Sequence, residues 1–358
     1  MKAKLLIVEL WGLGDLVIAT PFLRAASEKY DITLLAKPYA RDLQPRLWPN
    51  LKICPFNAPW TAFQKKYHVW RWPLREMFWV RQSLATEHFD CGFSARWDPR
   101  DHLLMRLIGV KERIGFPRIG SGLFLTQSLA RPDPALHRYE SWRAAGKVLD
   151  LELPPREELP VPPPKNLQTI VLHSGARLPA RIWPLENWRK LALHLRQKNY
   201  TVQVACDADQ EGWWKAHGEN DVACARTVAS LFSVIDGARV LVGNCSGPGH
   251  LAAICGVPTF TIFGPSLTEW FAPLHPQSEW IEGKACPYKP CSDYCHFSRP
   301  FCIQDLTEEE VRPHVERFLR KHFDSHGSDS RNGEPALAIA GVTSRSPDGQ
   351  GTRAAQVG

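Results

Sequence analysis

Asp15 lies just beyond a buried apolar run and directly after Gly12 and Gly14. Glycines let the backbone turn tightly and approach a ligand closely. Parallel α/β sheets bind ligands at the carboxyl ends of their strands, where this turn is expected to lie. We interpret Asp15 as a general base that faces a cleft and deprotonates the substrate, with Gly14 beside that substrate. The alternative role for Asp15 is to cap the helix that follows.

The turn at Gly12 carries only part of the dinucleotide-binding fingerprint G-x-G-x-x-G. Val17 occupies the position of the third glycine, which would let the helix pack closely on the strand. The turn therefore gives little support to an NAD-dependent oxidoreductase.

Two segments of the second half are typical of sites for a phosphorylated ligand. In the first, Ser174 and Gly175 follow a short strand, and Arg181 precedes a helix. A helix N-terminus beside an arginine can hold a diphosphate. In the second, a strand runs into a helix whose first amides can bind phosphate. Its candidate residues are Ser246, Gly247, Gly249 and His250. The alternatives are a solvated arginine and an ordinary helix histidine.

Four cysteines fall within 17 residues, at Cys286, Cys291, Cys295 and Cys302. Four thiolates can complete a tetrahedral zinc site, and an iron–sulfur cluster takes the same ligands. The spacings C-x4-C and C-x3-C are looser than the C-x2-C of zinc knuckles. We therefore keep a structural zinc site and a loop of reduced thiols as two interpretations.

The segment 63–82 mixes basic and aromatic residues. It contains three tryptophans, and its basic residues include Lys65, Lys66, Arg71 and Arg75. This composition suits an anionic lipid-linked acceptor or a membrane surface, and it would also stack on single-stranded nucleic acid. Because no DNA- or RNA-binding fingerprint accompanies it, we expect a glycolipid or membrane partner and no nucleic acid. A buried pair of aromatic helices is the alternative.

Apolar runs alternate with segments of helical periodicity, as in repeated βαβ units. Strands are expected at 4–10, 32–36, 91–94, 169–173, 201–206, 239–243 and 258–263, and helices at 16–30, 184–198, 228–236, 247–255 and 307–323. Thr307 and Glu310 form a capping box at the start of the last helix. The fold class is therefore α/β, with two Rossmann-like domains that face a central cleft.

A proline-rich stretch divides the chain. Six prolines fall in the eleven residues 154–164, where neither a helix nor a central strand can continue. We expect an N-terminal domain at 1–153, a linker at 154–165 and a C-terminal domain at 166–323, which includes the cysteines and the last helix. The remaining residues 324–358 lack aromatic side chains and are expected to form a disordered tail.

The 358 residues carry a net charge of +7, which fits an anionic small molecule or a membrane surface as easily as nucleic acid. No apolar run approaches the roughly 20 residues that a membrane-spanning helix needs. Glu9 interrupts the N-terminal run, and no small-residue cleavage site follows it, so we expect no signal peptide and a cytoplasmic protein.

In this order, the segments resemble glycosyltransferase family 9, the bacterial lipopolysaccharide heptosyltransferases. The resemblance is collinear over about 1–320, and the cysteine cluster is similar to that of some members. It rests on short motifs: G-x-G-D-x-V-x-A-T-P from Gly12, R-I-G-F from Arg113, H-x-G-A from His173, W-P at Trp183, S-G-P-x-H-L-A-A from Ser246, G-V-P from Gly256 and F-G-P from Phe263.

The resemblance implies a GT-B fold and an inverting, metal-independent sugar transfer that requires no cofactor. The donor would be ADP-heptose, bound by the second domain. The acceptor would be the lipopolysaccharide inner core or a related glycolipid, bound by the first domain at the cytoplasmic face of the inner membrane. The catalytic aspartate of the family falls on Asp15.

Two positions depart from the family pattern. Cys245 replaces the aspartate that precedes S-G-P-x-H, so a carboxylate that would hold the sugar is missing. Arg181 replaces a lysine before W-P, which keeps the positive charge and changes the contact geometry. The alternative to sugar transfer is therefore a nucleotide- or glycan-binding member with an altered donor or without transfer activity.

Overall fold

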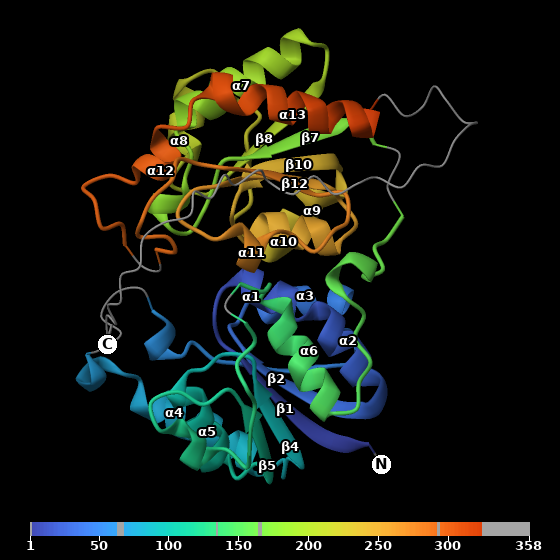
Figure 1. The fold of residues 1–358 in the computed structure, drawn as a ribbon, viewed down its shortest axis with the longest axis vertical. Helices are drawn as coiled ribbons and strands as arrows, with labels where there is room; N and C mark the ends of the chain where they lie inside the picture. The colour runs from blue at the N-terminus through green and yellow to red at the C-terminus, as the bar shows by residue number, and fades with distance from the viewer. Residues whose placement is uncertain (1, 63–67, 134, 164–166, 292–293, 324–358) are drawn as a thin grey trace, which may run out of the picture.

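The computed structural model describes residues 2–62, 68–133, 135–163, 167–291 and 294–323. Two parallel β-sheets of six strands each lie one above the other, with helices on their faces (Figure 1). If the strands of each sheet are numbered 1 to 6 by their order in the chain, both sheets have the spatial order 3-2-1-4-5-6. This order is typical of dinucleotide-binding folds, so the expected α/β class is confirmed.

The first sheet forms the lower half in Figure 1. Its strands, in spatial order, are β3 (Lys52–Pro55), β2 (Tyr30–Ala36), β1 (Ala3–Glu9), β4 (Cys91–Ser94), β5 (Glu112–Gly115) and β6 (Gln127–Ser128). The apolar run of β1 is buried between β2 and β4, as expected for the centre of a parallel sheet. Its carboxyl end, and that of β4, mark the point where the strand order reverses.

The helices of the lower half are α1 (Leu13–Ile18), α2 (Thr20–Lys29), α3 (Ala40–Leu47), α4 (Leu74–Ala85), α5 (Pro99–Ile108) and α6 (Tyr139–Val148), with the 3₁₀ turns η1 (Pro59–Thr61), η2 (Val69–Arg71) and η3 (Ser121–Phe124). The single helix expected at 16–30 was wrong. The structure begins a helix at Leu13 and divides it at Ala19, because Pro21 cannot donate a backbone hydrogen bond and starts a second helix instead.

The second sheet forms the upper half. Its strands, in spatial order, are β12 (Glu279–Glu282), β11 (Thr259–Phe263), β10 (Ala238–Asn244), β7 (Thr169–His173), β8 (Thr201–Cys206) and β9 (Ala223–Cys224). Its helices are α7 (Leu185–Gln197), α8 (Glu211–Ala216), α9 (Val228–Asp236), α10 (Gly247–Ile254), α11 (Thr268–Phe271), α12 (Phe301–Gln304) and α13 (Glu308–Phe323), with η5 (Pro179–Arg181). The strand order reverses between β7 and β10.

The capping box expected before the last helix is confirmed. The Thr307 amide donates to Glu310 Oε2 at 2.8 Å, and the Glu310 amide donates to Thr307 Oγ1 at 3.3 Å. Between the two sheets, the proline-rich stretch contains the short turn η4 (Arg156–Glu158). The residues 324–358, expected as a disordered tail, lie outside the described residues. In the described part of the chain, no helix is both long and apolar enough to cross a membrane.

The two halves meet closely along helices α1 and α10, which lie one above the other in the middle of Figure 1. A methyl group added to Gly14 would approach His250 Cδ2 to 2.8 Å, and one added to Gly247 would approach Leu13 Cβ to 2.9 Å. The Arg138 amide also donates to the carbonyl oxygen of Trp270 at 3.2 Å. The absence of Cβ atoms at two glycines thus permits the close approach of the two halves.

Candidate active site

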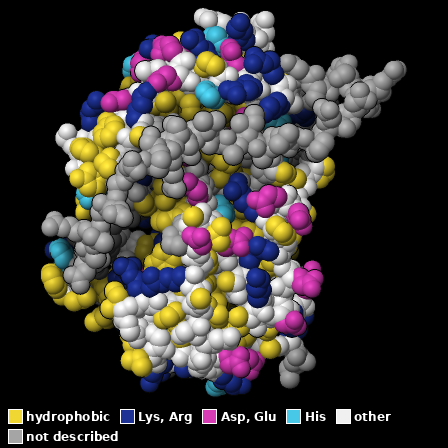
Figure 2. Space-filling view, viewed as in Figure 1, with side chains coloured by type: hydrophobic (Ala, Val, Ile, Leu, Met, Phe, Trp, Pro, Cys, Tyr) yellow, Lys and Arg dark blue, Asp and Glu magenta, His cyan; other side chains and the backbone are white. Residues whose placement is uncertain are grey.

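A cleft of about 1510 Å³ lies where the carboxyl ends of the two sheets face each other. Loops that follow β1, β2 and β4 line it from below, and loops that follow β7, β8 and β10 line it from above. In both sheets these loops include the point where the strand order reverses, which is the usual ligand site of such sheets. Basic side chains gather near this boundary in Figure 2.

Asp15 lines the cleft from the first turn of α1. Its Oδ2 accepts a hydrogen bond from the Gly12 amide at 3.2 Å, and its Oδ1 lies 3.1 Å from Arg96 Nη1. The first contact closes the first turn of α1, whose N-cap is Gly12, and the second holds the carboxylate toward the cleft. Asp15 thus lines the cleft, as the sequence suggested, but it is the third residue of α1 and not the N-cap that the alternative role requires.

Glu9 lies behind Asp15 at the end of β1. It is fully buried, and burial, helped by the nearby charge of Asp15, raises its pKa from 4.5 to about 8. Arg96 and a hydrogen bond of 3.1 Å from the Trp11 amide to Glu9 Oε1 act in the opposite direction. Burial thus favours the protonated form of the carboxyl that lies beside Asp15.

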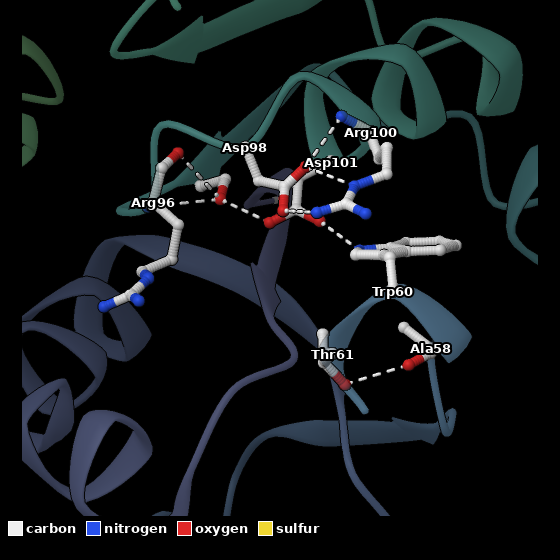
Figure 3. A network of polar contacts seen from close by, with 8 residues as sticks. Ala58, Trp60, Thr61, Arg96, Asp98, Arg100 and Asp101 are labelled. Carbon is white, nitrogen blue, oxygen red and sulfur yellow. Dashed lines mark hydrogen bonds and ion pairs between the residues drawn. The ribbon is translucent and has the colours of Figure 1, made fainter. Parts of the chain in front are cut away.

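A buried polar network fixes the loop that presents Arg96. Asp101 accepts hydrogen bonds from Trp60 Nε1 at 3.1 Å and from Ser94 Oγ at 3.2 Å, and the Ser94 hydroxyl accepts one from the Arg96 amide at 3.3 Å (Figure 3). Burial raises the pKa of Asp101 to about 7. These contacts hold the loop after β4 against η1, so that Arg96 is presented from a rigid support.

In the same loop, Asp98 caps helix α5 and holds Arg100 at the cleft. Its Oδ1 accepts from the Arg100 amide at 3.0 Å, and its Oδ2 lies 2.7 Å from Arg100 Nη2 (Figure 3). Both residues line the cleft. The carboxylate therefore fixes the direction of this guanidinium group before any ligand binds.

On the upper side of the cleft, Arg181 ends η5 and His250 lies in α10. Arg181 Nε and His250 Nδ1 are buried and have no hydrogen-bond partner among the described residues. Burial lowers the pKa of His250 from 6.5 to about 4, so its ring is neutral at neutral pH. Buried polar atoms normally have partners, so the hydrogen-bonding capacity of these two atoms is unused within the described part of the chain.

Gly175, Ser246 and Gly247 also line the cleft, as the sequence analysis suggested. Ser246 is the N-cap of α10, and its side chain makes no capping hydrogen bond. A methyl group added to Gly175 would lie 2.4 Å from Asp207 Cγ, so only glycine lets this loop pass beside the carboxylate. Buried Cys245 lies beside them, and burial raises the pKa of its thiol.

Two residues suggested for the upper site do not line the cleft. Ser174 is buried, and its hydroxyl donates to Gln210 Oε1 at 2.8 Å and accepts from Trp214 Nε1 at 3.0 Å. Gly249 is buried one turn into α10. Ser174 is thus engaged inside the second half, whereas its two neighbours His173 and Gly175 line the cleft.

The two described residues suggested for acceptor binding in the segment 63–82 do not line the cleft either. Arg71 and Arg75 are exposed on η2 and α4 and are not among the residues that line it, whereas Lys65 and Lys66 lie outside the described residues. Gly14 does line the cleft.

Sequence reasoning missed most of the charge in the cleft. Nine basic side chains and only four aspartates line it; the basic ones are Lys37, Arg41, Arg96, Arg100, Arg118, Arg138, Arg177, Arg181 and Arg226. Several follow directly after strands, a signal that could have found Lys37 after β2 and Arg96 after β4. Arg138 had no such signal, because it comes from the start of α6 and stacks on Trp270 at 4.2 Å.

The four cysteines give no support for a metal centre in the described ranges. No group of three or more His, Cys, Asp or Glu side chains there is arranged to hold a metal ion. Cys291 Sγ donates instead to the Tyr288 carbonyl at 3.6 Å, and burial raises the pKa of Cys302 to about 11. The zinc site stays a prediction.

Comparison with known proteins gives consistent matches. The model of glycosyltransferase family 9 (heptosyltransferase) matches residues 80–299. Lipopolysaccharide heptosyltransferase 1 of Pseudomonas aeruginosa is 30% identical over 160 residues, which cover 43% of this chain and 43% of that relative. The match thus spans less than half the length of this curated relative.

Two solved structures from Escherichia coli share the fold. Heptosyltransferase WaaC with ADP has a TM-score of 0.68 and 17% identity, covering 88% of this chain and 99% of that one. ADP-heptose lipopolysaccharide heptosyltransferase II has a TM-score of 0.65 and 18% identity, covering 90% and 99%. The expected GT-B arrangement of two facing Rossmann-like halves is therefore confirmed.

Proposed function

This chain belongs to glycosyltransferase family 9, and on that premise we propose that it is an inverting glycosyltransferase. The proposed donor is ADP-heptose, and the proposed acceptor is the lipopolysaccharide inner core or a related glycolipid. The observation that carries the proposal is the arrangement of one cleft, in which Asp15 lies below and Arg181 and His250, each with one buried nitrogen that has no hydrogen-bond partner among the described residues, lie above.

In this proposal Asp15 takes the proton from an acceptor hydroxyl. The hydroxyl oxygen then bonds to the anomeric carbon as the bond from that carbon to the diphosphate oxygen breaks. The nucleoside diphosphate leaves with the electron pair. Attack from the face opposite the leaving group inverts the anomeric centre.

The upper half would hold the leaving group. Arg181 and the amides at the start of α10 face the cleft, where they can neutralise charge that develops on the diphosphate. His250 is neutral and can donate or accept a hydrogen bond there. Because the protein itself supplies this positive potential, the scheme requires no metal and no cofactor.

The lower half would hold an anionic, lipid-linked acceptor. Six of the nine basic residues in the cleft come from this half: Lys37, Arg41, Arg96, Arg100, Arg118 and Arg138. Burial lowers the pKa of Lys37 to about 8, and an anionic ligand would restore its full charge. We place the reaction at the cytoplasmic face of the inner membrane, where such a lipid would be met.

A second candidate function is binding without transfer, or transfer from another donor. It is favoured by Cys245, because a buried thiol lines the upper cleft where the family pattern has an aspartate. Product formation from ADP-heptose would exclude loss of activity, and formation with another nucleotide sugar alone would identify an altered donor.

The test of the proposed function is transfer by purified protein and by Asp15→Asn. A general base typically accelerates a reaction about 10²- to 10⁴-fold, so we expect the kcat of the variant to fall by at least about 10²-fold. Its affinity for ADP should change by less than about 0.5 kcal/mol, since the base does not hold the nucleotide. Wild-type turnover in Asp15→Asn would remove the assigned base.

The zinc prediction has a separate test. Elemental analysis of the purified protein should find about one zinc per chain if the four cysteines form a tetrahedral site. Exchange of Cys286 and Cys295 for serine should then release it, and a metal-free wild-type protein would leave the reduced-thiol interpretation.

A further inference from the structure

Helix α4 has two apolar faces, although one suffices to attach a helix to a core. The face that packs on the core of the first half consists of Met77, Val80 and Leu84. At about 100° per residue, a second stripe on the opposite side is formed by Leu74, Phe78 and Trp79, whose exposed fractions are 55 to 65%. Folding of this half does not account for the second stripe.

The exposed stripe continues into η2. Val69 is 55% exposed and Trp70 is 75% exposed. We define the docking surface as Val69, Trp70, Leu74, Phe78 and Trp79. Apolar side chains stand out at the lower left of Figure 2, over the place where Figure 1 draws η2 and α4. Large apolar groups gathered in this way mark an interaction site.

The charge around the docking surface is mainly positive. Arg71, Arg75 and Arg81 are exposed on the same two elements, against Glu76 as the one acidic residue of 69–85. By its position along the helix, Arg75 lies within the apolar stripe and Arg81 lies at its edge. A partner of the docking surface must therefore combine an apolar region that these side chains can enter with negative charge.

We propose that the docking surface binds the anionic surface of a lipid bilayer. Tryptophan, phenylalanine and leucine on one side of a helix enter the boundary between headgroups and acyl chains, and arginines beside them attract anionic headgroups. A single-stranded nucleic acid would use the tryptophans and arginines but would leave Leu74 and Val69 exposed. A second copy of the chain would bring the same three arginines face to face.

The docking surface is tied to the rim of the cleft through α5. Arg81 Nε donates to the Leu107 carbonyl at 2.8 Å, and Arg106 Nη1 donates to the Leu123 carbonyl in η3 at 3.0 Å. Ile119, just before η3, is 82% exposed and also lines the cleft. A bilayer bound at α4 would thus lie beside the lower half of the cleft, where the proposed function places the lipid-linked acceptor.

The test is sedimentation of the full chain with vesicles of phosphatidylcholine, with and without about 30 mol% phosphatidylglycerol. We expect binding to the anionic vesicles and at least tenfold weaker binding of the double variant Phe78→Ser with Trp79→Ser. Each of Arg71→Ser and Arg75→Ser should weaken binding about fivefold, the value for one basic residue near such a surface. Leu193→Ser, which removes an exposed leucine from α7, is the matched control and should bind as the wild type does.

Affinity for ADP, measured on the same samples, should be unchanged in the double variant, which shows that it is folded. Vesicle binding needs neither donor nor acceptor, so its failure would not bear on the transfer reaction. The proposal is overturned if the wild type does not sediment with anionic vesicles, if neutral vesicles bind equally well, or if the double variant binds normally. Self-association that the double variant abolishes, without vesicle binding, would assign the surface to a second copy instead.

Discussion

At the scale of single residues, Asp15 has two contacts that belong to two different roles. One carboxylate oxygen closes the first turn of α1 through the Gly12 amide, and the other faces Arg96 in the cleft. The capping contact fixes the direction of the side chain, so the second oxygen meets a ligand without reorganisation. The contact within α1 and the proposed role as a base are therefore compatible at this position.

Glu9 gives the residue-scale prediction. Its pKa is about 8 in the folded chain against 4.5 for the free group, so the folded state holds a proton that the unfolded state releases between these values. Stability from this group is complete below pH 4.5 and is lost as the pH rises toward about 8, at no more than about 1.4 kcal/mol per pH unit. Because glutamine does not ionise, the Glu9→Gln variant should not lose this stability as the pH rises.

Urea unfolding at pH 5 and pH 8 measures the effect. We expect the free energy of unfolding of Glu9→Gln to rise relative to the wild type between the two values. The control Glu28→Gln, at an exposed position of α2, should follow the wild type at both. A constant difference between Glu9→Gln and the wild type would mean that the carboxyl titrates normally.

At the scale of elements, the site depends on how closely α1 and α10 approach. Both helices begin directly after the strands at which the order of their sheets reverses, so their N-terminal turns meet across the cleft. Gly14 and Gly247 leave room for His250 and Leu13 of the opposite helix. Asp15 and His250 are therefore brought near each other because Gly14 and Gly247 have no Cβ atom.

Gly14→Ala tests this packing. Alanine normally favours a helix over glycine, yet here its Cβ would lie 2.8 Å from His250 Cδ2. We expect a loss of about 1 to 3 kcal/mol in the free energy of unfolding, the usual cost of an overpacked contact. Calorimetric and urea unfolding measure it.

Gly212→Ala is the matched control, since nothing lies within 4 Å of an added methyl group in α8. This variant should gain about 0.5 to 1 kcal/mol from helix propensity. Equal gains in the two variants would show that α1 and α10 do not pack closely in solution.

At the scale of the whole molecule, an ion pair also joins the two halves, away from the close packing of α1 on α10. Arg46 in α3 forms a two-bond ion pair with Asp236 in α9, with distances of 2.6 and 2.7 Å. Arg46 also stacks on Phe232 at 4.6 Å. Because both charged groups are partly exposed, the pair contributes only about 0.2 to 1 kcal/mol. We expect a contact of this strength to allow opening of the cleft for ligand exchange.

Asp236→Ala should therefore favour opening without unfolding either half. We expect hydrogen exchange in α10 to become about two- to fivefold faster, which corresponds to the loss of one partly exposed ion pair. Exchange in the central strands β1 and β7 should stay unchanged. The control Lys215→Ala breaks a surface pair within α8 and should leave α10 unaffected. Unchanged exchange in α10 of Asp236→Ala would show that this pair does not hold the cleft closed.

Many of the local elements, and the chemistry nearest to the strands, could be predicted from the sequence alone. The strands at 91–94, 169–173 and 201–206 have the expected bounds, because short apolar runs between turns have few other stable conformations in an α/β chain. Asp15 could be found because it lies in the turn after the first strand, and Arg181 because it precedes a helix in the connection after β7. The split at Ala19 was missed, although Pro21 was visible, because helical periodicity continues across it.

Which of these residues lie together in one cleft depends on the tertiary structure. Arg138 and Arg96 are 42 positions apart, yet the strand order brings both to the cleft, and no local pattern encodes that order. In the same way, Ser174 turned inward while Gly175 reached the cleft, and the aromatic residues of α4 stayed exposed. Burial depends on what packs against a side chain, and those neighbours come from distant parts of the chain.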